Sequence, residues 1–172
     1  MYQGSKERKK RPVLDIPLSS LEKFLEALAF IGILLNIIFI AMFWTELPSK
    51  IPTHFGPSGA PDGWGGKGML LFLTGMNIMM YLLLTIVNKF PHTFNYPVKI
   101  TPENALKQYY LARHLLGFLK TETVLLFTYI LWGTIQVALG KAEGLGILFL
   151  PIILFIIFGT IGVYFYKAIR NT

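Results

Sequence analysis

Long uncharged apolar stretches alternate along this chain with shorter polar ones. Crossing a bilayer as a helix takes about 20 mostly apolar residues. Four stretches are long enough: residues 25–44, 69–87, 121–139 and 145–166. Between and around them lie a tail at 1–17, a loop at 45–68 and a segment at 88–120. The pattern predicts an all-α integral membrane protein with four transmembrane helices, forming one membrane domain over residues 1–172.

Composition and charge placement agree with a protein that contacts the lipid bilayer. The 172 residues are 53% hydrophobic and 15% charged, and the absence of cysteine excludes disulfides, thiolate metal sites and a cysteine nucleophile. If the N-terminus is cytoplasmic, 13 of the 16 Lys and Arg lie inside, against Lys50, Lys67 and Lys141 outside. The positive-inside rule therefore predicts a multi-pass cell-membrane protein with both termini cytoplasmic. Topology and contact with anionic lipid explain the net charge of +7, so no nucleic-acid partner is expected.

The cytoplasmic segment carries the signals of an amphipathic helix. Thr101-Pro102 predicts a helix start, with Thr at the N-cap and Pro at the first helical position. One apolar stripe follows it: Ala105, Tyr109, Ala112, Leu116 and Leu119. The helix should continue into the third span, lying along the headgroups or packing under the bundle. The alternative function of residues 102–120 is a docking surface for a cytoplasmic protein.

Ser19 and Glu22 have capping-box spacing, which places the first helix start ahead of the membrane.

The outer loop at 45–68 is the polar exception among these apolar stretches. Its four prolines fix φ and exclude a helix. Ser58-Gly59 and Asp62-Gly63 are turn dipeptides, in which glycine is free to take positive φ. We expect a compact, turn-rich loop on the outer surface, with Trp44 and Trp64 anchored at headgroup depth.

Five loop residues are candidates for ligand binding: Glu46, His54, Asp62, Trp64 and Lys67. The simpler interpretation is that they only organise the loop. His54 would then hydrogen-bond within the loop, Asp62 would shape the Asp-Gly turn, and Lys67 would cap carbonyls or meet headgroups. The functional interpretation is that they form a recognition site.

A motif favours the functional interpretation. The stretch LPSKIPTHFGPSGAPDGWGGK resembles a bacterial membrane domain of unknown function, which also forms the N-terminal part of the immunity proteins against the sporulation-delaying-protein toxin. The matching positions are Leu47, Pro48, Ile51, Pro52, His54, Gly59, Asp62 and Lys67. The resemblance implies immunity to a secreted peptide toxin and a signal passed inward by holding a repressor at the membrane. FNYPVKITPENALKQYYLAR, residues 94–113, is similar to a segment of stand-alone relatives. The further C-terminal membrane domain of the immunity proteins has a pattern that the last two apolar stretches lack.

Three of the polar residues within the apolar stretches are candidates for interhelical or boundary contacts: Asn36, Asn77 and Glu122. Asn36 and Asn77 both fall near the midplane, where we expect an interhelical hydrogen bond between them. The alternative is that they line a polar transport path. Glu122 is expected to be an interface residue.

Three basic residues are candidate partners for the Glu122 carboxylate: Lys120, Arg113 and Lys23.

The resemblance and the absence of catalytic motifs favour a non-enzymatic function of the immunity or signalling type, in which the outer loop recognises or shields against a secreted peptide or envelope ligand. No catalytic residue, metal site or cofactor is assigned, because no catalytic or phosphate-binding motif is present. One alternative is a metal-assisted membrane enzyme using His54 and Asp62, with Glu46 as a third ligand. Another is a small-molecule transporter or a subunit of a larger membrane complex. An oligomer is compatible with each of these.

Overall fold

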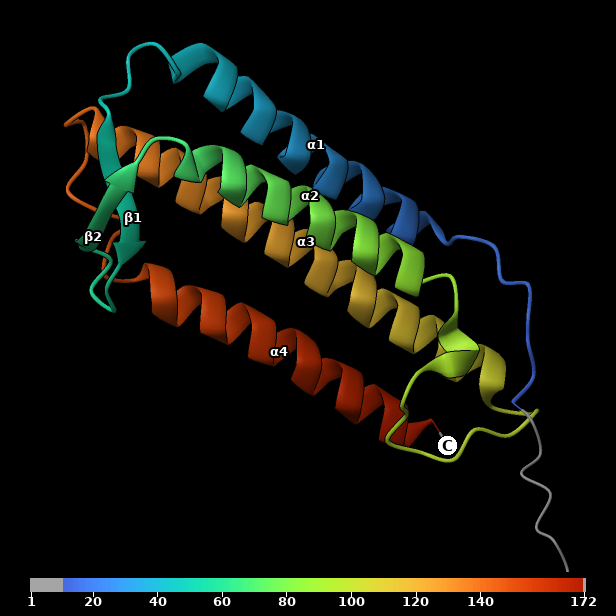
Figure 1. The fold of residues 1–172 in the computed structure, drawn as a ribbon. Coiled ribbons are helices and arrows are strands. Elements are labelled where there is room, and N and C mark those ends of the chain that lie inside the picture. Colours follow the sequence, from blue (N-terminus) through green and yellow to red (C-terminus); the bar gives the residue numbers. More distant parts are fainter. Residues whose placement is uncertain (1–10, 172) are drawn as a thin grey trace, which may run out of the picture.

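A bundle of four helices carries a small β-hairpin across one of its ends (Figure 1). The computed structural model describes residues 11–171. The helices are α1 (Ser20–Phe43), α2 (Met69–Val87), α3 (Ala105–Ala138) and α4 (Phe149–Arg170), with strands β1 (Lys50–Phe55) and β2 (Pro61–Gly66) and a short 3-10 helix, η1 (Pro91–Thr93). All four α-helices are long and apolar enough to cross a membrane, which confirms the all-α membrane fold. Part of the expected basic tail, residues 1–10, lies outside the described residues.

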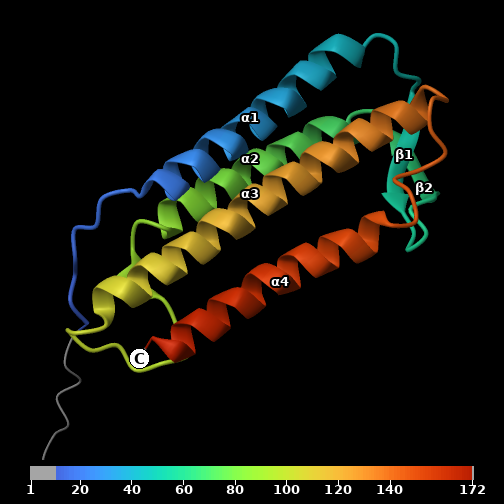
Figure 2. The same ribbon diagram turned by 180° about the vertical axis from the view of Figure 1, so that it is seen from behind.

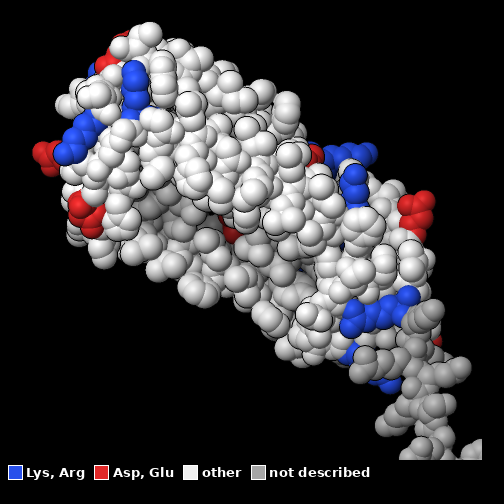
Figure 3. All heavy atoms as spheres, viewed as in Figure 1, with Lys and Arg blue, Asp and Glu red and all other residues white. Residues whose placement is uncertain are grey.

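The bundle has a hairpin end and a terminal end. The hairpin end comprises residues 44–68 and 139–148. The terminal end comprises residues 11–19, 88–104 and 171, and the C-terminal end of α4 lies there (Figure 1). On the face seen in Figure 3, charged side chains gather towards these two ends and the middle is almost entirely uncharged. That distribution matches an apolar layer between two aqueous surfaces.

Local hydrogen bonds explain where α1 and α3 begin. The capping box is confirmed: Ser19 Oγ accepts from the Glu22 N–H, and Glu22 Oε2 accepts from the Ser19 N–H at 2.7 Å. The predicted N-cap at Thr101 is wrong, because residues 102–104 form a turn and α3 begins only at Ala105. Asn104 holds this turn, since its Oδ1 accepts from the Thr101 N–H at 2.9 Å.

The central element is α3, which packs against α1, α2, α4 and β1, whereas α4 packs chiefly against α3 (Figures 1 and 2). The predicted amphipathic helix does continue into the third span, giving one helix of 34 residues. At about 1.5 Å per residue, α3 is about 51 Å long and α2 about 28 Å. Because the apolar layer of a bilayer is about 30 Å thick, α3 extends roughly 20 Å beyond it at the terminal end.

A close approach between α1 and α3 depends on Gly32. A Cβ at this position would lie 2.7 Å from Val124 Cγ1. The buried carbonyl of Gly32 accepts from Thr128 Oγ1 at 3.2 Å and from Asn36 Nδ2 at 2.7 Å. Small residues at such crossings let helix backbones approach closely enough for interhelical hydrogen bonds.

The expected hydrogen bond between Asn36 and Asn77 is not formed. Asn36 Nδ2 donates to Thr128 Oγ1 at 2.6 Å, and Asn77 Nδ2 donates to the Val124 carbonyl at 3.3 Å. Both side chains are fully buried, and neither Oδ1 has a partner. The prediction fails because α1 and α2 each pack more extensively against α3 than against one another, so each asparagine meets α3 first.

A buried ion pair fastens α1 to α3 towards the terminal end. Arg113 Nε donates to Glu22 Oε1 at 2.7 Å, and both side chains are less than 8% exposed. Arg113 Nη1 also donates to the Ile16 carbonyl at 2.7 Å, which holds the segment before α1 against α3. Each charge therefore has a partner, as burial requires.

A second polar cluster joins three helices. Lys120 on α3 donates to Glu26 on α1 and, at 3.0 Å, to Thr85 on α2. Tyr81 of α2 donates to the same Glu26 carboxylate at 2.5 Å.

These pairs leave Glu122 with a different partner from those expected. Arg113 is taken by Glu22 and Lys120 by Glu26, and Glu122 instead accepts from Thr160 of α4 at 2.5 Å. Lys120 and Glu122 also point away from each other, because residues two apart lie on different sides of a helix.

The terminal end has its own small core, built on the predicted stripe. Ala105 and Tyr109 pack with Ile16, and Ala112 packs with Tyr164 and Ala168 of α4. Burial raises the pKa of the neighbouring Tyr96 hydroxyl well above its usual range, and this hydroxyl donates to the Pro91 carbonyl at 2.8 Å. Much of the apolar stripe is thus covered by other parts of the same chain.

His114 of α3 also packs at this end. Its Nε2 lies 3.1 Å from Ser19 Oγ, beside the capping box of α1.

The Glu22–Arg113 pair leads to a stability prediction. Arg113→Met leaves the Glu22 carboxylate buried without a counter-charge, so we expect the free energy of unfolding to fall by about 3–5 kcal/mol. Denaturant titration in mixed detergent micelles measures it. Lys107→Met is the matched control, because Lys107 is exposed on the same helix, and it should change stability by less than about 0.5 kcal/mol. Equal losses in the two variants would contradict this account of the pair.

Candidate functional site

The expected outer loop is built around a hairpin that the sequence analysis did not predict. Strands β1 and β2 pair antiparallel, with Lys50 opposite Gly66, Pro52 opposite Trp64 and Phe55 opposite Pro61. The ladder is irregular on both sides of His54. Prolines are tolerated here because both strands of a two-stranded sheet are edges. The missed signal is Ile-x-Thr-x-Phe at 51–55, an alternation of β-forming residues.

The hairpin is seated on the helix ends by apolar packing. Ile51 of β1 is fully buried and packs in a cluster with residues from the turn after α1, from α2 and from α3. The other buried members are Leu47, Leu70, Leu131 and Ile135. Full burial of such a side chain contributes about 1.5–3 kcal/mol, which fixes β1 against the bundle.

The hairpin tip is tied to the connection between α3 and α4. Gly59 has φ +79°, and its N–H donates to the Gly56 carbonyl at 2.8 Å, so Ser58-Gly59 does form the predicted turn. The Gly59 carbonyl accepts from the Leu145 N–H at 2.8 Å. A Cβ on Gly59 would collide with the backbone of Gly146. The predicted Asp62-Gly63 turn is wrong, because both residues lie in β2 beside the irregular pairing at His54.

Three of the five candidate residues are exposed on the hairpin, and two of them are in contact. His54 Nδ1 is hydrogen-bonded to Asp62 Oδ1, and the two side chains are 71% and 53% exposed. Trp64 is also exposed, two residues after Asp62 on β2. We call His54, Asp62 and Trp64 the exposed hairpin face. It offers hydrogen-bonding groups and an aromatic ring on one hairpin.

The other two candidates do not join this face. Lys67 Nζ donates to the Trp44 carbonyl at 3.1 Å and lies 4.8 Å from the centre of the Trp44 ring. It therefore caps the C-terminal end of α1 and links it to the start of α2. Glu46 is exposed in the turn after α1.

Metal binding needs several converging ligands, commonly three or more for zinc. Within residues 11–171, no group of three His, Asp or Glu side chains comes together. His92 belongs to η1 at the terminal end and His114 contacts Ser19 there, far from His54 along the bundle.

Comparison with known proteins adds a family match over the hairpin and its flanking helices. Residues 31–78 match the family described as "Domain of unknown function (DUF1648)". This stretch begins inside α1, contains β1 and β2 and ends inside α2. The fold is that of a multi-pass membrane protein, and residues 31–78 are similar to a domain of that kind.

One relative is an uncharacterized protein of Archaeoglobus fulgidus, which is 35% identical over 78 residues. The alignment covers 37% of this chain and 43% of the relative, so the chain spans less than half of the relative's length. No solved structure matches the chain.

The tip contact leads to a second prediction. In Gly59→Ala, the Cβ meets the Gly146 backbone and the positive φ becomes strained, a cost of about 1–3 kcal/mol. We expect the Leu145 amide, which donates to Gly59, to exchange its hydrogen at least about tenfold faster, as measured by hydrogen exchange with mass spectrometry. Gly66→Ala is the control, since no atom lies within 4 Å of a Cβ there. Unchanged exchange in Gly59→Ala would show that the tip is not held by this contact.

Proposed function

We propose that this protein is a non-enzymatic membrane protein of the immunity or signalling type, whose hairpin end faces the cell exterior and recognises or shields against a secreted peptide. One observation carries the proposal: polar and aromatic groups are exposed together on a hairpin that the bundle holds in place. A loop that only capped the bundle would have no use for an exposed His54–Asp62 pair. A surface that recognises a peptide needs exposed polar and aromatic groups of this kind.

A peptide suits the exposed hairpin face for two reasons. Trp64 is 49% exposed, and aromatic side chains of this kind dominate binding energy in protein interfaces. Within the described part of the chain, β2 pairs only with β1, so its other edge is unpaired. An extended peptide can add to such an edge through main-chain hydrogen bonds. The His54 and Asp62 side chains would then select polar groups on that peptide.

The outward orientation and the inward relay are parts of the same proposal. The distribution of Lys and Arg favours a cytoplasmic terminal end. Because α3 contacts β1 and also reaches the terminal end, it connects the exposed hairpin face to the cytoplasmic side in one element. A cytoplasmic partner at residues 102–120 would use side chains that the chain leaves uncovered there, such as Leu106 and Lys107.

The resemblance to the immunity proteins supports the choice of ligand class. Its motif spans the residues that form the hairpin, its seat at Leu47 and Ile51, and the Lys67 cap. The family match at residues 31–78 overlaps the same region. A toxin peptide is therefore the first ligand to test.

The orientation is tested by site-directed labelling, which this cysteine-free chain makes simple. Ser58→Cys, at the exposed hairpin tip, should react with a membrane-impermeant maleimide in intact cells. Lys99→Cys, exposed at the terminal end, should react only after the membrane is permeabilised. The reverse result would place the hairpin in the cytoplasm and overturn the proposed function.

Protection is tested in cells sensitive to the sporulation-delaying-protein toxin. Expression of the chain should raise survival above that of cells with empty vector. Trp64→Ala and Asp62→Ala should each lower the protected fraction by about tenfold or more, as loss of a central contact residue does. Phe30→Ala, exposed in the middle of α1, should protect like the parent chain. Survival equal to empty vector would remove the immunity function, and full protection by both hairpin variants would remove the exposed hairpin face from it.

A further inference from the structure

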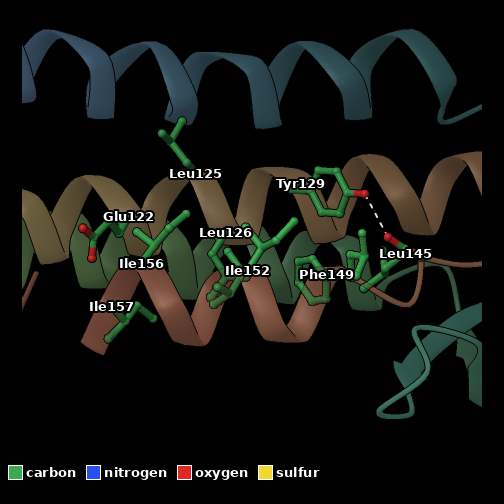
Figure 4. A pocket seen from close by; sticks show the side chains of 12 residues that line it. Glu122, Leu125, Leu126, Tyr129, Leu145, Phe149, Ile152, Ile156 and Ile157 are labelled. Atoms are coloured by element: carbon green, nitrogen blue, oxygen red, sulfur yellow. Dashed lines mark hydrogen bonds between the residues drawn. The ribbon is translucent and has the colours of Figure 1, made fainter. Parts of the chain in front are cut away.

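A cavity of about 550 Å³ lies between α3 and α4. Its walls are apolar, with Leu125 and Leu126 on α3 and Ile152, Ile153 and Ile156 on α4. Figure 4 shows the Glu122 carboxylate at one end of this row of side chains and Tyr129, Leu145 and Phe149 at the other. The cavity is therefore an elongated apolar pocket with a single acidic side chain, Glu122, at one end.

Only one of the two carboxylate oxygens of Glu122 has a hydrogen-bond partner. Its Oε1 accepts from Thr160 at 2.5 Å, whereas its Oε2 is buried and has no hydrogen-bond partner. No salt bridge to Glu122 is found within residues 11–171. A buried carboxylate oxygen without a partner is costly, and a ligand that donates a hydrogen bond to it removes that cost.

The position of Glu122 indicates which kind of ligand can reach it. Along α3, Glu122 lies about 24 Å from the hairpin end, in a bundle whose shortest spanning helix is about 28 Å long. It is thus close to the terminal-side boundary of the apolar layer. From Glu122 to Tyr129 the cavity runs about 10 Å towards the hairpin end. A lipid-like molecule of the terminal-side leaflet has this layout, with its head near the boundary and its tail towards the middle.

We propose that the α3–α4 cavity is a binding site for a membrane amphiphile, with an alkyl chain between Leu126 and Ile153 and a small hydrogen-bond donor, hydroxyl or amine, at Glu122 Oε2. The apolar walls match the chain, and the unpaired oxygen matches the donor. Because α4 packs chiefly against α3, a molecule from the bilayer can reach the cavity from beside α4.

The far end of the cavity is connected to the hairpin. Tyr129 donates to the Leu145 carbonyl at 2.9 Å, and the Leu145 N–H donates to the Gly59 carbonyl (Figure 4). The occupant would thus contact the loop that holds the hairpin tip. The site itself is separate from the exposed hairpin face, and the proposal does not depend on the proposed function.

The test is photo-crosslinking of the full chain in phosphatidylcholine nanodiscs. The probe is dodecanol with a diazirine at the end of its chain, and labelled peptides are identified by mass spectrometry. We expect labelling to concentrate on residues 145–149, where the tail should end. Unlabelled dodecanol and dodecylamine should compete, and dodecane should not. The stronger of the two competitors identifies the head as hydroxyl or amine.

Three variants separate recognition of the head from filling of the chain site. Glu122→Leu removes the acceptor and should lower labelling by about tenfold, as expected for a lost hydrogen bond. Leu126→Trp fills the cavity and should abolish labelling. Leu154→Trp is the matched control, because Leu154 is exposed on α4 and does not line the cavity. Size-exclusion profiles check folding, and if Glu122→Leu does not fold, the competition on the parent chain decides.

Other outcomes overturn the proposal. Competition by dodecane equal to that by dodecanol would mean that any alkyl chain fills the cavity without recognition at Glu122. Labelling spread evenly over the exposed faces of α1, α2 and α4 would indicate ordinary surrounding lipid. Labelling of the exposed helix faces with none at residues 145–149 would show that the probe does not enter the cavity, and would overturn the proposal.

Discussion

Polar groups buried inside a helix bundle must find their partners within the protein, and in this chain α3 supplies most of them. Asn36 from α1 and Asn77 from α2 both donate to α3, and Glu22 and Glu26 both pair with basic residues of α3. Each unsatisfied group would cost several kcal/mol in lipid. The position of α1 and α2 against α3 is therefore set by hydrogen bonds and charges as well as by the close approach at Gly32.

Helix α3 also fixes the position of the hairpin. Ile51 packs against Leu131 and Ile135 of α3, and the tip is hydrogen-bonded to Leu145 in the connection that follows α3. The exposed groups on β2 thus stand on a surface that is fastened at its base and at its tip. Such fastening lowers the entropy that a loop would lose on binding a ligand.

The sequence predicted those features that depend on neighbouring residues. Apolar length defined four spanning helices, and Ser19 with Glu22 defined the start of α1. The hydrogen-bond partners of the polar side chains could not be predicted, because they depend on which helix lies between two others. Asn36 and Asn77 are at similar depth, yet α3 reaches both first, and Glu122 turns to Thr160 because α4 covers that side of α3.

The candidate site was predictable in part for the same reason. Ser58-Gly59 is a local turn and was correctly identified, whereas the pairing of β1 with β2 was hidden by prolines that usually indicate irregular loops. The His54–Asp62 contact follows from that pairing. Lys67 does not lie with His54 and Asp62, because its ammonium group contacts both the carbonyl and the ring of Trp44 at the end of α1.

The continuity of α3 gives the molecule a mechanical property. Its 34 residues contain no proline and form one uninterrupted rod, and a helix without a kink behaves as a stiff beam over this length. Pivoting such a beam by about 5° at the β1 contact would swing its opposite tip by about 4 Å. A small displacement of α3 at the hairpin end would therefore produce a larger one at the terminal end, and the helices bonded to α3 would move with it.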